Sequence, residues 1–312
     1  MGLTYVEALV IGALQGVTEL FPVSSLGHSV LIPALVGGRW AADLSVSAPE
    51  SPYLAFIVGL HVATAIALIV YFWRDWLRIL GGIVTSVRYR RIQTPDERLA
   101  WMIIIGTIPV GIAGLLLEHT FRTVLGRPVP AAVFLILNGL ILLAAERWRR
   151  IAATRGAGPG TVATRGVAVT PESHVDNSDI ASDRRIAKRG ILETTGIATA
   201  QIAALLPGIS RSGVTMVAGL TRGLSHEDAA RFSFLLATPV ILAAGVLKVP
   251  DLTGPLGAGI RGPVLAGSCA AFVAACVAVR FLTRYFRSGT LRPCAWYCLV
   301  AGAGSFAWLA LH

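Results

Sequence analysis

The sequence predicts an all-α protein that crosses a membrane several times, because it is apolar throughout and contains long hydrophobic stretches. Of its 312 residues, 54% are hydrophobic and 14% are charged, and the mean hydropathy is +0.69. This composition is typical of polytopic membrane proteins. The stretches long enough to span the hydrocarbon core of a bilayer are residues 54–73, 99–118, 131–146, 233–249, 263–279 and 294–311.

Two more apolar segments, residues 1–36 and 191–221, are interrupted near the middle by proline, serine and glycine. The first contains LFPVSSLGH at 20–28, and the second contains LPGISRSG at 206–213. A proline breaks a helix, and the hydroxyls and glycines beside it leave backbone N–H groups open. We therefore expect each segment to form a re-entrant hairpin of two half-helices, in addition to about six transmembrane helices.

The basic residues are distributed as a membrane topology requires. Lys and Arg number 27 against 17 Asp and Glu, which gives a net charge of +10. Of these 27, 21 lie in four connections that the positive-inside rule places in the cytoplasm, so a nucleic-acid partner is not needed to explain the charge. These connections are residues 74–98, 147–190, 222–231 and 280–292, whereas the opposite connections, 37–53, 119–130 and 246–262, hold five.

This topology makes the two hairpins enter from opposite faces, so that their tips could meet near the midplane. A second repeated element, TIPV at 107–110 and TPV at 238–240, follows one hairpin each. Inverted repeats with discontinuous helices commonly build a buried site in this way. The predicted organisation is a first membrane repeat (1–146), a polar flexible cytoplasmic loop (147–190) and a second membrane repeat (191–312).

The first interrupted segment carries polar side chains suited to catalysis. Gln15 and Glu19 are four residues apart and share one helix face, where a carboxylate could bind a cation or take a proton. An amphipathic surface helix is the alternative explanation. Ser25 lies three residues from His28, a spacing that suits a nucleophile and its base, or the histidine can protonate a leaving group. Alternatively, a serine caps the next half-helix and His28 is hydrogen-bonded inside the bundle.

Arg211 in the second interrupted segment points to an anion site. A charge near the centre of a membrane costs roughly 2.5–3.5 kcal/mol, so its presence requires a partner or a function. Ser210 and Ser212 flank Arg211, and a helix is expected to begin near Val214. A guanidinium, two hydroxyls and a helix N-terminus together suit a phosphate or a diphosphate. The alternative is a structural ion pair between Arg211 and Glu19.

The two motifs in this order resemble the signatures of the bacterial undecaprenyl-diphosphate phosphatases, also called bacitracin-resistance proteins. The resemblance rests on ALQGVTELFPVSSLGH at 13–28 and LLPGISRSGVT at 205–215, and it extends to LHVATAIALIVYFW at 60–73 and ARFSFLLATPVILAAG at 230–245. It implies an integral membrane hydrolase that converts undecaprenyl diphosphate into undecaprenyl phosphate and inorganic phosphate. Such an enzyme recycles the lipid carrier for peptidoglycan synthesis and confers bacitracin resistance.

The resemblance also implies roles for individual residues. Glu19 matches an acidic metal or proton site, Ser25 and His28 match the catalytic serine and histidine, and Arg211 matches the phosphate-binding arginine. The implied cofactor is Mg²⁺ or Ca²⁺, held by Glu19 and Gln15, although many relatives have Glu at the latter position. The further phosphate-binding residues are Ser24, Gly208, Ser210, Ser212, Gly213 and Thr215. A second departure is Ala63, where glycine is frequent.

Two other classes of protein share some of these features. A transporter or flippase of polyprenyl phosphate lipids would also need inverted repeats and a buried arginine, but not a serine beside a histidine. Another lipid phosphatase superfamily has a histidine soon after its SR element, whereas here His226 is the next one. The expected location is the bacterial inner membrane, with the site open to the external face. The expected partners are the polyprenyl diphosphate and the bilayer, and a homodimer is left open.

Overall fold

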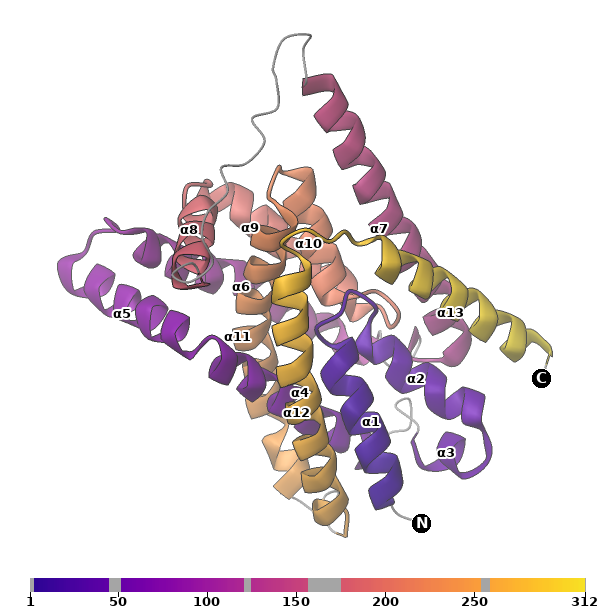
Figure 1. Ribbon diagram of the computed structural model, residues 1–312. Helices are drawn as coiled ribbons and strands as arrows, with labels where there is room; N and C mark the ends of the chain where they lie inside the picture. Colours follow the sequence, from indigo (N-terminus) through magenta and orange to yellow (C-terminus); the bar gives the residue numbers. More distant parts are fainter. Residues whose placement is uncertain (1–2, 45–51, 121–124, 157–174, 254–258, 312) are drawn as a thin grey trace.

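The computed structural model describes residues 3–44, 52–120, 125–156, 175–253 and 259–311, and within these ranges the chain is helical and has no strand (Figure 1). The predicted all-α class is therefore confirmed. The helices are α1 (Tyr5–Thr18), α2 (Ser25–Val36), α3 (Gly38–Asp43), α4 (Pro52–Tyr71), α5 (Trp73–Tyr89), α6 (Pro95–Thr120), α7 (Pro128–Gly156), α8 (Val175–Ala187), α9 (Ile191–Thr199), the 3-10 helix η2 (Ala200–Leu205), α10 (Arg211–Thr221), α11 (His226–Thr253), α12 (Arg261–Tyr285) and α13 (Arg292–Leu311).

The predicted spans correspond to long helices. In the described part of the chain, five helices are long and apolar enough to cross a membrane: α6, α7, α11, α12 and α13. Helix α4 adds a sixth when it is counted with α5, although the two helices are bent by 86° where they meet. Charged residues such as Arg74 and Asp75 begin at this bend, where continuing through hydrocarbon would be costly. The protein is therefore a multi-pass membrane protein.

Both interrupted segments are broken where the sequence predicts. In the first segment α1 ends at Thr18 and α2 begins at Ser25, and in the second η2 ends at Leu205 and α10 begins at Arg211. The four residues before each new helix include a proline, which cannot donate the backbone hydrogen bond that a continuing helix needs. In Figure 1 the first hairpin lies in the lower half of the molecule and the second in the upper half.

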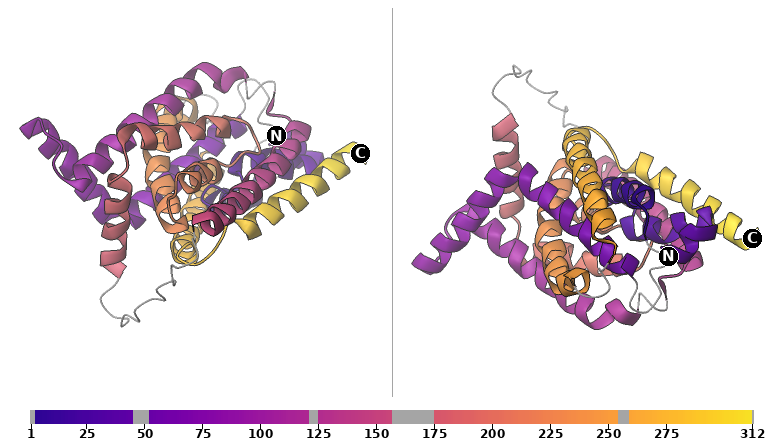
Figure 2. Two further views of the ribbon diagram at one scale, coloured as in Figure 1. Left: turned by 90° about the horizontal axis from the view of Figure 1, so that it is seen from above. Right: turned by 90° about the horizontal axis from the view of Figure 1, so that it is seen from below.

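Close helix packing fixes the first hairpin and its neighbours. Helix α1 lies directly against α12, because a Cβ atom on Gly12 would come within 2.2 Å of the carbonyl oxygen of Gly267. Helix α13 lies against α7, where a Cβ atom on Gly139 would come within 2.8 Å of the carbonyl oxygen of Ala295. Figure 2 shows α7 and α13 side by side at one edge of the bundle. Only glycine permits backbones to approach this closely.

The segment 147–190, which was predicted to be a flexible loop, is helical near both of its ends. Helix α7 continues as far as Gly156, and residues 175–187 form helix α8. Residues 157–174 lie outside the described part of the chain. Helix α8 packs against α6 and α11, so polar composition alone did not reveal that it is ordered.

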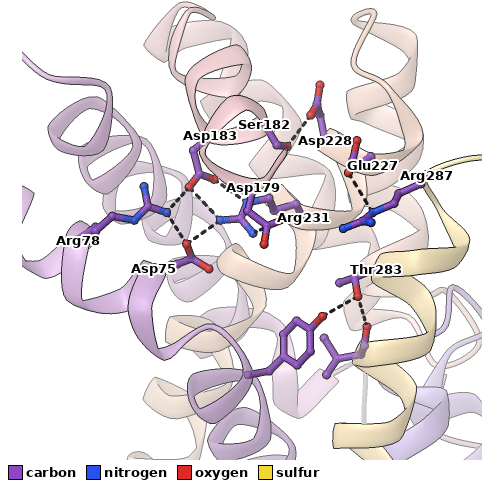
Figure 3. Close-up of polar contacts among 12 residues, drawn as sticks. Asp75, Arg78, Asp179, Ser182, Asp183, Glu227, Asp228, Arg231, Thr283 and Arg287 are labelled. Carbon is purple, nitrogen blue, oxygen red and sulfur yellow. Dashed lines mark hydrogen bonds and ion pairs between the residues drawn. The ribbon is translucent and has the colours of Figure 1, made fainter. Parts of the chain in front are cut away.

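Ion pairs and hydrogen bonds hold the polar side of α8, while Ile186 is the one large side chain among its described residues in the hydrophobic core. So few apolar residues leave no clear periodicity in the sequence, which explains the missed prediction. Asp183 of α8 accepts a hydrogen bond of 2.7 Å from Nε of Arg231 on α11, and Arg231 also lies 2.9 Å from Asp75 of α5 (Figure 3). Ser182 of α8 donates a hydrogen bond of 2.5 Å to Asp228. Arg231 is buried, and a buried guanidinium needs such partners.

Candidate active site

The two helix breaks meet each other, as the inverted topology predicts. The backbone N–H of Gly208 donates a hydrogen bond of 3.2 Å to Oγ of Ser24. From the second hairpin, Oγ of Ser212 donates a hydrogen bond of 3.2 Å to the carbonyl oxygen of Phe21. These contacts join positions more than 180 residues apart in the sequence. The two motifs therefore form one site.

Asn138 of α7 connects the two breaks from a third direction. Its Nδ2 donates to the carbonyl oxygen of Pro22, and its Oδ1 accepts from the backbone N–H of Ser210, both at 3.0 Å. The side chain is fully buried. Both backbone groups were freed by the helix breaks, so the amide replaces lost helical hydrogen bonds. The sequence analysis missed this residue, for which the signal is a lone amide within the apolar stretch 131–146.

The serine and glycine positions are explained by two helix N-caps of the same kind. Oγ of Ser24 accepts a hydrogen bond from the N–H of Gly27, and Oγ of Ser210 accepts one from the N–H of Gly213. Ser24 has φ of 69° and Gly208 has φ of 109°, so each break contains one residue with left-handed backbone. Such a conformation is unfavourable for a residue other than glycine, which marks Ser24 as strained.

Glu19 lies at the centre of the site. Its Oε1 forms an ion pair with Arg211, and its Oε2 accepts a hydrogen bond from Ser25. Gln15 also donates to Oε2, at 2.9 Å, and Nε2 of His61 lies 3.2 Å from the same atom. The Glu19 side chain is 5% exposed and the Arg211 side chain 15%. The ion pair between Arg211 and Glu19, which the sequence left as the alternative to an anion site, is therefore formed in the free protein. Ser25, Gln15 and His61 contact the same carboxylate.

His61 of α4 was not identified from the sequence as a site residue. Its Nδ1 lies 2.8 Å from the carbonyl oxygen of Ile57, and its Nε2 faces the Glu19 carboxylate. Both neighbours are acceptors, so both ring nitrogens must carry hydrogen for both contacts to be hydrogen bonds. The site then contains two cations, Arg211 and His61, against one carboxylate, which favours an anionic ligand. A histidine within the apolar stretch 54–73 is the signal that could have found it.

The predicted pair of Ser25 and His28 is not formed, and this expectation needs correction. Ser25 donates its hydrogen bond to Glu19 instead. His28 has its Nδ1 2.7 Å from the carbonyl oxygen of Ser24 and its Nε2 2.7 Å from the hydroxyl of Tyr297. The spacing of three residues did bring the two side chains onto one helix, but the carboxylate before the break lies closer to the serine. The base nearest to the hydroxyl of Ser25 is therefore Glu19.

The other predicted phosphate-binding residues have partners within the protein. Thr215 donates to the carbonyl oxygen of Arg211 at 2.8 Å, within helix α10. The hydroxyls of Ser210 and Ser212 are 3.1 Å apart. The N–H groups of Gly208 and Gly213 are capped by serine hydroxyls. Nη1 of Arg211 donates to the carbonyl oxygen of Ala237 at 3.0 Å, which orients the guanidinium toward Glu19.

The donors that could hold a divalent cation are Glu19 and Gln15. In the part of the chain that the structure describes, no group of three or more His, Cys, Asp or Glu side chains could hold a metal ion. Oε1 of Gln15, however, is a buried oxygen without a hydrogen-bond partner among the described residues. Carboxylate and amide oxygens suit Mg²⁺ and Ca²⁺. The two side chains therefore fit one part of a coordination sphere, and phosphate oxygens would have to supply more ligands.

Comparisons with known proteins identify the family of the chain. Residues 8–304 match the family described as bacitracin resistance protein BacA. The undecaprenyl-diphosphatase of Mycolicibacterium paratuberculosis is 66% identical over 310 residues, which cover 99% of both chains. Undecaprenyl-diphosphatase 1 of Frankia casuarinae is 56% identical, over 96% of both chains. The undecaprenyl-diphosphatase of Granulibacter bethesdensis is 38% identical, over 97% of this chain and 96% of that protein. The chain therefore belongs to the bacitracin resistance protein BacA family.

Proposed function

We propose that this protein is a membrane phosphatase that hydrolyses undecaprenyl diphosphate to undecaprenyl phosphate and inorganic phosphate. The observation that carries the proposal is the meeting of Arg211 and Ser25 on the same carboxylate, Glu19, at the junction of the two hairpins. An anion-binding cation and a hydroxyl with an adjacent base are what phosphoryl transfer through a nucleophile requires. The names of the relatives supply the substrate.

Glu19 occupies the place of a substrate anion in the free protein. It accepts contacts from Arg211, Ser25 and His61, which are the types of donors that bind phosphate oxygens. A diphosphate entering the site would take over the contact with Arg211. The N-termini of α2 and α10 meet at the same point and add two positive dipole ends. Charge neutralisation at the phosphoryl oxygens would then supply much of the rate increase.

The arrangement favours Ser25 as the nucleophile. Its Oγ would attack the terminal phosphorus while its proton passes to Glu19, with which it is already hydrogen-bonded. The bond between the terminal phosphorus and the bridging oxygen breaks, and the polyprenyl monophosphate leaves with that oxygen. Water then hydrolyses the phosphoserine and releases inorganic phosphate. Water activated by His28 is the alternative to attack by Ser25. In the Ser25 route, His28 would act as the acid–base group of a separate proton transfer, protonation of the leaving oxygen.

A divalent cation is part of the proposal. Glu19 and Gln15 would hold it, and it would supply additional positive charge for the phosphate oxygens.

The membrane location fits a lipid substrate. Withdrawing a polyprenyl chain from the bilayer would cost about 0.8 kcal/mol per methylene, so a site between the leaflets lets the tail stay in place. The expected location is the bacterial inner membrane, with the site open to the external face, because the distribution of basic residues predicts that the first hairpin enters from that side. Release of the monophosphate there would recycle the carrier for peptidoglycan synthesis. We also expect the activity to confer bacitracin resistance, as the description of the family implies.

Phosphate release from a long-chain isoprenyl diphosphate in detergent tests the proposal. The purified protein should release inorganic phosphate, and Arg211→Ala should abolish the release while the variant remains folded. A chelator should lower the activity, and added Mg²⁺ or Ca²⁺ should restore it. Movement of headgroups across vesicle membranes without phosphate release would instead establish a transporter.

A further inference from the structure

Helix α13 is positioned by its packing against α7 and by Asn138. A Cβ atom on Gly302 would come within 2.7 Å of the side chain of Ile136, so α13 and α7 are in direct contact at this level. Nδ2 of Asn138, which also holds the carbonyl oxygen of Pro22, lies 3.3 Å from Sγ of Cys298. The residue before this cysteine on α13 is Tyr297. The contact between α7 and α13, together with Asn138, therefore sets the position of Tyr297.

Tyr297 contacts His28 in two ways. Its hydroxyl lies 2.7 Å from Nε2 of His28, a normal length for a strong hydrogen bond between side chains. The two rings also stack, with centroids 5.6 Å apart and planes inclined by 11°. One contact fixes the direction of the ring nitrogen, and the other fixes the ring plane. His28 is buried and Tyr297 is partly exposed, so the tyrosine lies between the imidazole and the surroundings.

The hydrogen-bond partners determine which nitrogen of His28 can accept a proton. Nδ1 faces the carbonyl oxygen of Ser24, which only accepts, so Nδ1 carries the hydrogen. Nε2 of the neutral ring is then the basic nitrogen, and it accepts a hydrogen bond from Tyr297. Ser25, in contrast, gives its hydrogen bond to Glu19. Two separate side-chain pairs that can transfer protons, Ser25 with Glu19 and His28 with Tyr297, therefore lie near the start of α2.

We propose that Tyr297 is a positioning residue for His28 in the hydrolysis reaction. The hydroxyl and the ring of Tyr297 hold the imidazole as the tautomer with a basic Nε2. A proton that Nε2 takes up or gives during the reaction would move through the hydroxyl of Tyr297. The inference rests on the proposed function, because it assigns the residue a part in that reaction. It extends the site to α13, a helix outside both hairpins.

A simpler explanation is that a tyrosine hydroxyl in a membrane needs a polar partner and that His28 happens to supply one. Tyr71 provides a test of this explanation within the same chain. Its hydroxyl also has one side-chain partner, Thr283 on another helix, at 2.8 Å. Tyr71→Phe therefore makes the same chemical change, the loss of one interhelical hydroxyl hydrogen bond, without involving His28.

A double-mutant cycle distinguishes the two explanations. The four proteins to compare are the wild type, Tyr297→Phe, His28→Ala and the double variant, with phosphate release from a long-chain isoprenyl diphosphate as the readout. General acid–base catalysis contributes about 100-fold or more, and a variant with a misplaced base should lose part of it. We expect Tyr297→Phe to lower kcat about tenfold with KM nearly unchanged. In the background of His28→Ala, the same substitution should change kcat less than twofold, because a residue that acts through His28 has no effect without it.

Each outcome decides the question. Equal losses in both backgrounds, or a loss for Tyr71→Phe as large as for Tyr297→Phe, would overturn the inference, as would His28→Ala with normal turnover. If the wild type releases no phosphate, the proposed function fails first. The pair can then be judged from the ¹⁵N resonances of the histidines in labelled protein. Tyr297→Phe should shift an unprotonated Nε2 resonance that Tyr71→Phe leaves in place, and an unshifted resonance would refute the pairing itself.

Discussion

The two re-entrant hairpins have the same backbone design but contribute opposite chemistry. In each, a serine caps the second half-helix and one break residue has a left-handed backbone. The first hairpin supplies the carboxylate of Glu19 and the hydroxyl of Ser25, whereas the second supplies the guanidinium of Arg211. Neither half contains a complete site. The two breaks therefore share one backbone arrangement, while the side chains of the proposed reaction are divided between them.

The largest effect should follow from removing the cation of the second hairpin. Arg211→Ala leaves Glu19 buried with His61 as its remaining basic neighbour and removes the proposed phosphate ligand. We expect phosphate release to fall by about a thousandfold, on the scale of losing a central electrostatic contact. Arg211→Lys should recover a part of the activity, because a lysine keeps the charge but not the fork of the guanidinium.

Kinetics of the purified variants, with thermal unfolding as the control for folding, measure the activities of Arg211→Ala and Arg211→Lys. Normal turnover of Arg211→Ala would remove the main support for an anion site.

The next largest effect should come from the hydroxyl of the first hairpin. Ser25→Ala removes the proposed nucleophile, and we expect a loss of about 100-fold or more in kcat with KM little changed. The matched control is Ser210→Ala, which removes a hydroxyl from the second break. This variant should retain turnover within about tenfold, since that hydroxyl caps a helix. Comparable losses in the two variants would show that the caps, rather than a nucleophile, account for the sensitivity.

These two serines also show where sequence reasoning succeeded and where it could not. The repeated order of proline, serine and glycine predicted two broken hairpins in the correct places, because proline and glycine act locally. The same order aligned Ser25 with Ser210, each three residues after a proline. The helix caps align Ser24 with Ser210 and therefore Ser25 with Arg211. The position of a cap depends on which residue can adopt the break conformation, and spacing from a proline does not determine it.

Residues outside the two hairpins were missed for a different reason, although His61 stands within the stretch 60–73 that carries part of the resemblance. Asn138, His61 and Tyr297 each lie in an apolar helix, and their contacts come from helices that pack together in three dimensions. The helix α8 was missed because it has few apolar residues and many of its partners are charged groups of α5 and α11. Periodicity finds a helix that buries an apolar face, but it carries no information about distant polar partners.

Removing the link between the two hairpins should lower stability more than any single cap. Asn138→Leu leaves the carbonyl of Pro22 and the N–H of Ser210 without the amide. An unsatisfied buried polar group costs about 1–3 kcal/mol, so we expect the free energy of unfolding to fall by roughly 2–4 kcal/mol. Thr107→Val is the matched control, since it removes a hydroxyl bond within a single helix. Thermal unfolding in detergent measures both variants. A similar small shift for each would mean that the link between the breaks contributes little.

His61 lies outside both hairpins and would be a second cation of the site when protonated, so its removal should have a moderate effect. His61→Gln keeps a group that can donate to Glu19 but removes the charge. We expect KM for a long-chain diphosphate to rise about tenfold, which corresponds to about 1.4 kcal/mol of binding free energy, with a smaller change in kcat. An unchanged KM would confine anion binding to Arg211 and the two helix N-termini.

The smallest effects are expected from the two N-cap serines, Ser24 and Ser210, and they should differ in size. Ser24→Ala removes a cap, removes the acceptor for Gly208 and keeps a side chain on a backbone with φ of 69°. Ser210→Ala removes a cap at φ of −86°, where alanine is not strained. A cap costs about 0.5–2 kcal/mol, so Ser24→Ala should lower the free energy of unfolding by more than Ser210→Ala does.

Ser24→Gly then shows how much of this difference in the free energy of unfolding comes from the left-handed backbone at position 24. Glycine adopts the left-handed conformation without a steric penalty and replaces a serine cap at a cost of a few tenths of a kcal/mol. It still leaves the N–H of Gly208 without the hydroxyl of Ser24. We therefore expect the stability of Ser24→Gly to lie between that of the wild type and that of Ser24→Ala in thermal unfolding. If Ser24→Ala and Ser24→Gly unfold at the same temperature, the strain at this break is unimportant, and the two hairpins differ in their chemistry alone.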